Sequence, residues 1–70
     1  MLKRKDKIKV MRKSENSNTY FNDNEGIILD LSYNKSGEVI FVKYLQRDWP
    51  SLDAAEWVAV NAARIKVVKI

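Results

Sequence analysis

The chain has 70 residues, of which 13 are Lys or Arg and 9 are Asp or Glu, so its formal net charge is +4. It contains neither Cys nor His, which excludes disulfide bridges, thiolate or imidazole metal sites and His-based acid–base catalysis. Seventy residues suffice for one small domain, and its stability must come from an apolar core because no cross-link is present.

Positive charge is concentrated at the start of the sequence. Residues 1–13 hold seven basic residues and one acidic residue, a net charge of +6, whereas residues 14–70 hold six basic and eight acidic residues, a net charge of −2. A basic segment on a nearly neutral body favours an acidic partner, which is a nucleic acid, an anionic membrane face or an acidic protein. A solvated arm followed by the outward face of a strand explains the pattern equally well. Residues 1–5 are expected to be a disordered basic tip, and residues 6–70 a single domain.

Residues 6–13 (DKIKVMRK) alternate between apolar and basic side chains. Ile8 and Val10 fall on one face, while Lys7 and Lys9 fall side by side on the other. This period of two, with β-branched residues, predicts a half-buried strand with a basic outer face. That face is the first candidate site for an acidic partner, although lysines also protect an edge strand from aggregation.

Residues 14–24 (SENSNTYFNDN) are rich in Asn and Ser, which predicts a long loop. Tyr20 and Phe21 interrupt this polar stretch. In SH3-like domains a loop of this kind lays aromatic side chains along a ligand groove. The alternative is that one of the two rings plugs the end of a barrel.

A hairpin is predicted from Gly26 onward, because two apolar runs flank a short turn. Alternation in the first run predicts a strand whose apolar face carries Ile27, Leu29, Leu31 and Tyr33. Residues 34–37 (NKSG) predict the turn, since Asn and Gly both tolerate positive φ. Residues 38–45 (EVIFVKYL) form the third strand, and their two apolar faces are typical of a central strand.

Residues 46–55 (QRDWPSLDAA) contain the single proline of the sequence and predict a loop. Its Trp49 is a binding candidate, because a large apolar side chain is costly to leave exposed.

Residues 56–70 (EWVAVNAARIKVVKI) have two interpretations. One is a helix that begins near Asp53 with a capping box. The other is two strands, WVAV and IKVVKI, joined by a single tight turn or 3₁₀ turn at 61–64 (NAAR). The many β-branched residues favour the strands. Trp57, within WVAV, is expected in the core.

Together these elements predict an all-β fold, a small five-stranded SH3-like barrel with a long first loop and a 3₁₀ turn before the last strand. Closing the sheet removes the exposed edges that five open strands would carry. The alternative is a β-meander with a C-terminal helix packed across it.

The motifs KIKV, TYFNDNEGIILDL, GEVIFVKY, the DW loop, WVAV and NAARIKVV resemble, in their order over residues 7–69, the SH3-like accessory subunits of photosynthetic electron-transfer complexes. Subunit S of the NAD(P)H dehydrogenase-like complex and subunit IV of photosystem I belong to this group. Tyr20-Phe21-Asn22, followed by Gly26-Ile27, is similar to the run of both that leads into a Gly-opened strand. The stretch 46–55 is longer here than in subunit S, and subunit IV has a Gly-rich loop instead.

The resemblance implies a non-catalytic docking subunit without a cofactor that helps acidic ferredoxin bind a membrane-bound multisubunit complex. It also implies a cytoplasmic or stromal location, peripheral on the thylakoid membrane. No run of residues is long and apolar enough for a membrane span or a signal peptide, and the isolated subunit is expected to be a monomer. The candidate partner-binding residues are Lys7, Lys9, Arg12, Lys13, Tyr20, Phe21, Lys43, Arg47 and Trp49.

Two other functions remain open. Small barrels bind single-stranded nucleic acids with a basic track and stacking aromatics, for which Tyr20, Phe21, Tyr44 and Trp49 are available. A structural or regulatory protein-interaction module is the third possibility. An enzyme is not expected, because no general base, nucleophile elbow or phosphate-binding Gly loop accompanies the carboxylates.

Overall fold

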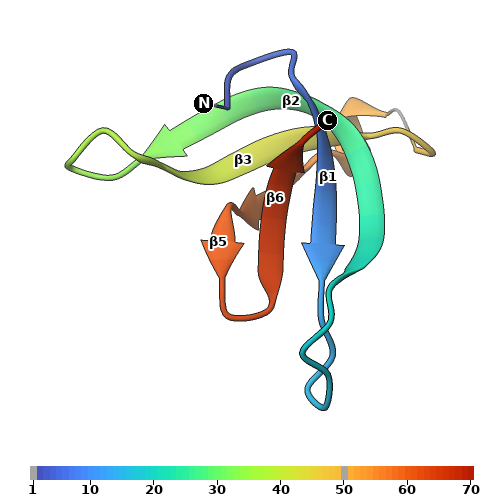
Figure 1. Cartoon of the computed structure of the whole chain (residues 1–70). Helices are drawn as coiled ribbons and strands as arrows, with labels where there is room; N and C mark the ends of the chain where they lie inside the picture. Colours follow the sequence, from blue (N-terminus) through green and yellow to red (C-terminus); the bar gives the residue numbers. More distant parts are fainter. Residues whose placement is uncertain (1, 50) are drawn as a thin grey trace.

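The chain folds as a single antiparallel β-sheet in the computed structural model, which describes residues 2–49 and 51–70 (Figure 1). These residues contain six strands, numbered in the order of the chain. In the sheet they lie side by side in the order β4-β3-β2-β1-β6-β5. The strands are β1 (Lys7–Arg12), β2 (Phe21–Tyr33), β3 (Val39–Gln46), β4 (Glu56–Ala59), β5 (Asn61–Ala62) and β6 (Ile65–Lys69). One turn of 3₁₀ helix, η1 (Leu52–Ala54), precedes β4. The expected all-β class is confirmed.

The long strand β2 pairs with two neighbouring strands, and Figure 1 shows that it is strongly curved along its length. Its first half pairs with β1 and its second half pairs with β3. Gly26 lies where the two pairings overlap, opposite both Ile8 and Gln46. A Cβ atom at this position would come within 2.2 Å of the Leu45 carbonyl oxygen, so only glycine permits the close approach.

The core consists of side chains from the inner faces of β1, β2, β3, β4 and β6. Its buried members are Ile8, Val10, Ile28, Val42, Tyr44, Val58 and Val67. Ile8 and Val10 are wholly buried, which confirms the expected alternation of the first strand. Burial of a Val or Ile side chain contributes roughly 1.5–3 kcal/mol, so these few residues supply most of the hydrophobic stabilisation.

The predicted apolar face of the second strand is right at Leu31, which packs against the core, but wrong at Ile27, because a bulge between the two shifts the alternation. Ile28 lies opposite Tyr44 and Asp30 lies opposite Lys43, which leaves Leu29 as an extra residue without a partner. Ile28 therefore points into the core, whereas Ile27 is 42% exposed on the outer face.

The β2–β3 hairpin is confirmed, with Gly37 in the left-handed region at φ 83°. The Gly37 N–H donates to the Asn34 carbonyl oxygen at 3.1 Å, which closes the turn. β3 has strand neighbours on both sides, as expected for a strand with two apolar faces. Its second apolar face is open, however, since Phe41 on that face is 44% exposed.

The C-terminal stretch is strand–turn–strand, so the alternative with a C-terminal helix is wrong for the described residues. Of the two turns expected at 61–64, the structure has the tight turn, at residues 63–64, and not the 3₁₀ turn. Asn61 and Ala62 pair with Lys66 and Ile65 as a hairpin, which adds a sixth strand, and the 3₁₀ turn lies earlier, at Leu52–Ala54. Pro50, the single proline of the predicted loop 46–55, lies outside the described residues.

Val60, between β4 and β5, connects two strands that are not neighbours in the sheet order. Its N–H donates to the Ile40 carbonyl oxygen in β3, and its own carbonyl oxygen accepts from the Val67 N–H in β6, both at 3.0 Å. The chain thus bends back toward β6 after leaving β3.

Candidate functional site

The outer face of β1 carries a row of lysines. Lys7, Lys9 and Lys13 alternate along the chain with the inward positions, and Lys66 of β6 lies directly opposite Met11 of β1. From Lys7 to Lys13 the row extends roughly 20 Å, at about 3.3 Å per residue. We call Lys7, Lys9, Lys13 and Lys66 the lysine row.

The arginines and lysines of this protein differ in their partners. In the described part of the chain every arginine forms an ion pair, whereas among the lysines only Lys69 does, with Asp6 at 3.7 Å. The arginine pairs are Arg4–Asp30, Arg12–Asp23, Arg47–Glu25, Arg47–Asp48 and Arg64–Glu15. The charge of the lysine row is therefore not neutralised by neighbouring carboxylates, which leaves it available to an anionic partner.

Tyr20 lies beneath the end of the lysine row. The Lys13 and Lys66 ammonium nitrogens lie 5.2 and 5.6 Å from the centroid of its ring. Each contact is a cation–π attraction, worth about 0.5–1 kcal/mol at an exposed site. The ring therefore holds together two ammonium groups that repel each other. Phe21 begins β2 opposite Arg12 and is half exposed.

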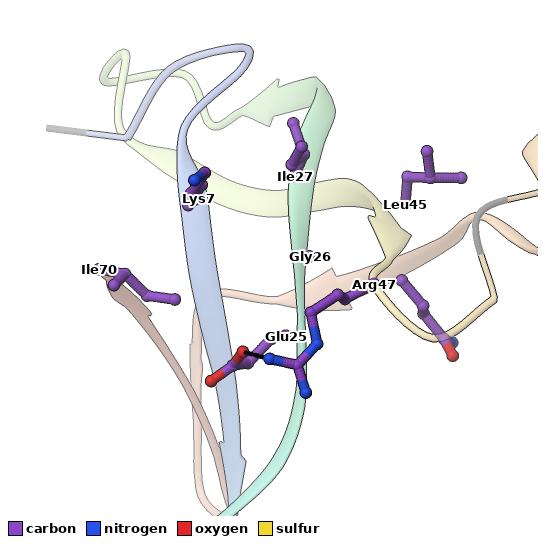
Figure 2. Close-up of a pocket in the computed structure, with 8 residues that line it drawn as sticks. Lys7, Glu25, Gly26, Ile27, Leu45, Arg47 and Ile70 are labelled. Atoms are coloured by element: carbon purple, nitrogen blue, oxygen red, sulfur yellow. Dashed lines mark hydrogen bonds and ion pairs between the residues drawn. The ribbon is translucent and has the colours of Figure 1, made fainter.

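An apolar groove borders the lysine row on the same face. Its volume is about 410 Å³, and Figure 2 shows its lining from β1, β2, β3 and the end of the chain. The lining residues are Lys7, Glu25, Gly26, Ile27, Leu45, Gln46, Arg47 and Ile70. Ile27 and Ile70 are 42% and 60% exposed, so this apolar surface is open to solvent.

Glu25 and Arg47 form the polar end of this groove. The Arg47 guanidinium reaches the Glu25 carboxylate, as the dashed line in Figure 2 marks, and the Arg47 N–H donates to the Glu25 carbonyl oxygen at 2.8 Å. Their charges cancel. Among the charged side chains of the groove residues, all of which are described, only Lys7 has no ion-pair partner.

The structure brings together only some of the residues predicted to form the site. Lys7, Lys9 and Lys13 share one face, and Arg47 reaches the groove beside it. Tyr20 joins them through its contact with Lys13, whereas the other four candidates lie elsewhere. Arg12 is paired with Phe21 and bound to Asp23 at 2.7 Å. Lys43 lies between Asp30 and Trp57, and Trp49 is 65% exposed in the loop after β3.

Sequence reasoning missed Lys66 and the apolar residues Ile27, Leu45 and Ile70. Lys66 carries a signal, since it alternates with Ile65 and Val67, but its partner in β1, Met11, is 55 residues away in the sequence. The three apolar residues come from β2, β3 and the segment after β6, and only the register brings them together.

Trp57 and Tyr44 exchange the roles expected of them. Trp57, expected in the core, is 49% exposed and lines a second groove of about 310 Å³ with Ser32 and Phe41. Tyr44, proposed as a stacking residue, is 1% exposed. Its hydroxyl donates to the Glu56 carboxylate at 3.2 Å. Burial, with the nearby Glu56 charge as the second cause, raises the pKa of Tyr44 to about 12.

The described residues contain no cluster of Asp, Glu, His or Cys that could hold a metal ion. They also contain no helix with the length and apolar character needed to cross a membrane. Comparison of the chain with models of protein families, with curated proteins and with solved structures finds no match.

Proposed function

We propose that the protein is a non-catalytic docking module, built as a small SH3-like barrel, that binds an acidic partner protein through the outer face of β1. The observation that carries the proposal is the lysine row, which lacks carboxylate partners and lies beside an open apolar groove. Barrel closure is supported by the two hydrogen bonds of Val60, which connect the chain between β4 and β5 to both β3 and β6.

A protein partner fits this face better than a nucleic acid. Uncompensated lysines accelerate encounter with an acidic surface, and an apolar groove then adds contacts that salt does not screen. Single-strand binders instead need free aromatic faces on which bases stack. Here the Tyr20 ring is engaged by two lysines, and the Tyr44 ring is buried. The exposed rings of Phe21 and Trp49 are not part of the lysine row, since Phe21 pairs with Arg12 and Trp49 lies in the loop after β3.

Ferredoxin is the acidic partner to test first. The resemblance to accessory subunits of photosynthetic electron-transfer complexes points to an acidic electron carrier, and the positive sign of the lysine row agrees with it. In this proposal the protein is a peripheral subunit that works at the cytoplasmic or stromal face of the thylakoid membrane. In this role it holds no cofactor and only positions the acidic partner on the complex.

Charge-reversal variants test the proposal. We expect the protein to bind oxidised ferredoxin, measured by amide NMR shifts, and the affinity to fall steeply between about 20 and 200 mM salt because the Debye length shortens. The variant Lys7→Glu/Lys9→Glu should lose at least tenfold in affinity. The single reversal Lys35→Glu, in the β2–β3 turn, is the control for the effect of one reversed charge away from the lysine row and should stay close to wild type.

Three results would contradict the docking proposal. The first is the absence of ferredoxin binding together with shifts in the lysine row on addition of single-stranded RNA, which would indicate a nucleic-acid binder. The second is ferredoxin binding that Lys7→Glu/Lys9→Glu leaves unchanged. The third is equal loss of affinity in the Lys35→Glu control, which would show that only net charge matters.

A further inference from the structure

The apolar groove has a floor and two walls, which Figure 2 shows from the side of β1 and β2. Gly26 and Ile27 of β2 form the floor. Lys7 and Ile70 stand on one side, and Leu45 and Arg47 stand on the other. A volume of about 410 Å³ lies within the range of about 300–1,000 Å³ that ligand pockets occupy.

The backbone beneath the groove cannot recruit a further strand. β1 lies between β2 and β6, and β2 lies between β1 and β3, so their hydrogen-bonding edges are already used. Recognition by strand addition needs a free edge. A ligand in this groove is therefore held by side chains, through apolar contact and charge.

The charges around the groove indicate which charged group a ligand needs beside its apolar side chain. The Glu25 carboxylate is occupied by the Arg47 guanidinium and by the Asn22 side-chain amide at 3.4 Å. Lys7 has no carboxylate within 4.0 Å among the described residues, and Lys9 follows it on the same face. The free positive charge lies along the β1 wall, while the opposite wall is internally neutral.

From this arrangement we infer that the groove binds a short acidic–apolar segment of a partner protein. One apolar side chain of that segment fills the space between Ile27, Leu45 and Ile70, and an adjacent carboxylate pairs with Lys7. The inference rests on the proposed docking function and deepens it, because it names the part of the acidic partner that enters the site. The lysine row alone requires only negative charge, whereas the groove requires an apolar side chain beside it.

A set of three synthetic peptides tests the inference, with amide NMR as the readout. The probe is an end-blocked seven-residue peptide with Asp-Leu-Glu at its centre and Gly and Ser on either side. One control replaces the central Leu by Ser, and the other replaces Asp and Glu by Asn and Gln. We expect saturable shifts of Lys7, Ile27, Leu45 and Arg47 with the probe, and at least fivefold weaker binding with each control.

A matched pair of protein variants tests the location. Ile27→Ala removes the floor of the groove, and Ile40→Ala removes an isoleucine of similar exposure, 38%, from β3 outside it. Dispersed amide spectra establish that both variants are folded. Ile27→Ala should lower the affinity for the probe and for ferredoxin at least threefold, while Ile40→Ala should leave both affinities unchanged.

Each other outcome overturns the inference in a recognisable way. If ferredoxin binding depends on Lys7 and Lys9 but is unchanged in Ile27→Ala, the docking function stands and the groove has no part in it. If all three peptides bind equally, the groove does not read an acidic–apolar segment. If the groove amides shift with protein concentration alone, and sedimentation shows a dimer, the occupant is a second copy of this chain. If neither ferredoxin nor the probe binds, both proposals fail.

Discussion

Arg47 and Glu25 are joined twice, once through their backbones and once through their side chains. The Arg47 N–H donates to the Glu25 carbonyl oxygen at 2.8 Å, and its guanidinium binds the Glu25 carboxylate. The first contact fixes the chain leaving β3 against β2. The second removes a negative charge from the neighbourhood of Lys9, which lies opposite Glu25 in the β1–β2 pairing.

Removal of the guanidinium should therefore affect binding more than stability. In Arg47→Ala the free energy of unfolding should fall by less than about 1 kcal/mol, because the arginine side chain is two-thirds exposed and exposed ion pairs contribute little. Affinity for an acidic partner should fall severalfold, since Glu25 then repels it. Adding Glu25→Gln should restore the affinity; if it does not, Arg47 contacts the partner directly. Urea denaturation and a binding titration measure the two effects.

The two glycines should respond differently to the same substitution. Gly26→Ala places a Cβ atom 2.2 Å from the Leu45 carbonyl oxygen and 2.8 Å from the Tyr44 ring, so we expect a loss of about 3 kcal/mol or more, at the upper end of the cost of overpacking. Gly37→Ala meets nothing within 4 Å but keeps φ at 83°, which costs about 1 kcal/mol. Denaturant unfolding of both variants measures the difference, and equal losses would contradict the close approach at Gly26.

Tyr20 should organise the lysine row. Tyr20→Leu removes both cation–π contacts and should lower the free energy of unfolding by about 1–2 kcal/mol. It should also lower the affinity for an acidic partner, because Lys13 and Lys66 are then free to separate. Tyr20→Phe keeps the ring and should behave as wild type in both measurements. Loss of affinity in Tyr20→Phe as well would instead assign the role to the hydroxyl group.

Alkaline pH should destabilise the fold through Tyr44. Its pKa is raised from 10.0 to about 12 in the folded state, so the proton is held more tightly there than in the unfolded chain. The resulting stability is fully present below pH 10 and is lost as the pH rises toward 12. Ultraviolet titration should show one tyrosine ionisation near pH 12. This ionisation should be absent in Tyr44→Phe and present in Tyr33→Phe. A wild-type titration complete before pH 11 would contradict the buried hydroxyl.

Acidic pH should destabilise the fold through Asp30, whose pKa is lowered in the folded state rather than raised. The Leu31 N–H, which donates to its carboxylate at 2.8 Å, and then the Arg4 guanidinium at 3.0 Å lower the pKa of Asp30. Its contribution is therefore present above pH 3.8 and is lost as the pH falls through the lowered value. Asp30→Asn should make the unfolding midpoint less sensitive to pH in this window than in wild type. NMR titration of the carboxyl carbon gives the value directly.

The sequence predicts the strands of this protein better than it predicts their faces. Alternation in β1 is unbroken, so Ile8 and Val10 could be assigned to the core and Lys7 and Lys9 to the surface. In β2 the extra residue Leu29 reverses the alternation, and no local signal marks the bulge. Trp57 was expected inside on hydrophobicity, yet the inward position of β4 belongs to its neighbour Val58.

The candidate site was predictable only where it lies within one strand. Three members of the lysine row come from β1 and the residue after it, and alternation is enough to group them. Lys66 and the groove require the pairing of β1 with β6 and of β2 with β3. Likewise, the charge of Arg4 is compensated by Asp30, 26 residues away, and counting residues along the chain cannot reveal this pairing.

The pairing of β1 with β6 has a consequence for how fast the protein folds. Ile8 lies opposite Lys69, so this contact closes a loop of nearly the whole chain, whereas the β2–β3 hairpin closes over a short turn. Loop closure costs more entropy as the loop lengthens, and non-local strand pairing slows folding to milliseconds or seconds. We therefore expect the hairpin to form early, and the lysine row and the groove, which both use the β1–β6 contact, to be completed late.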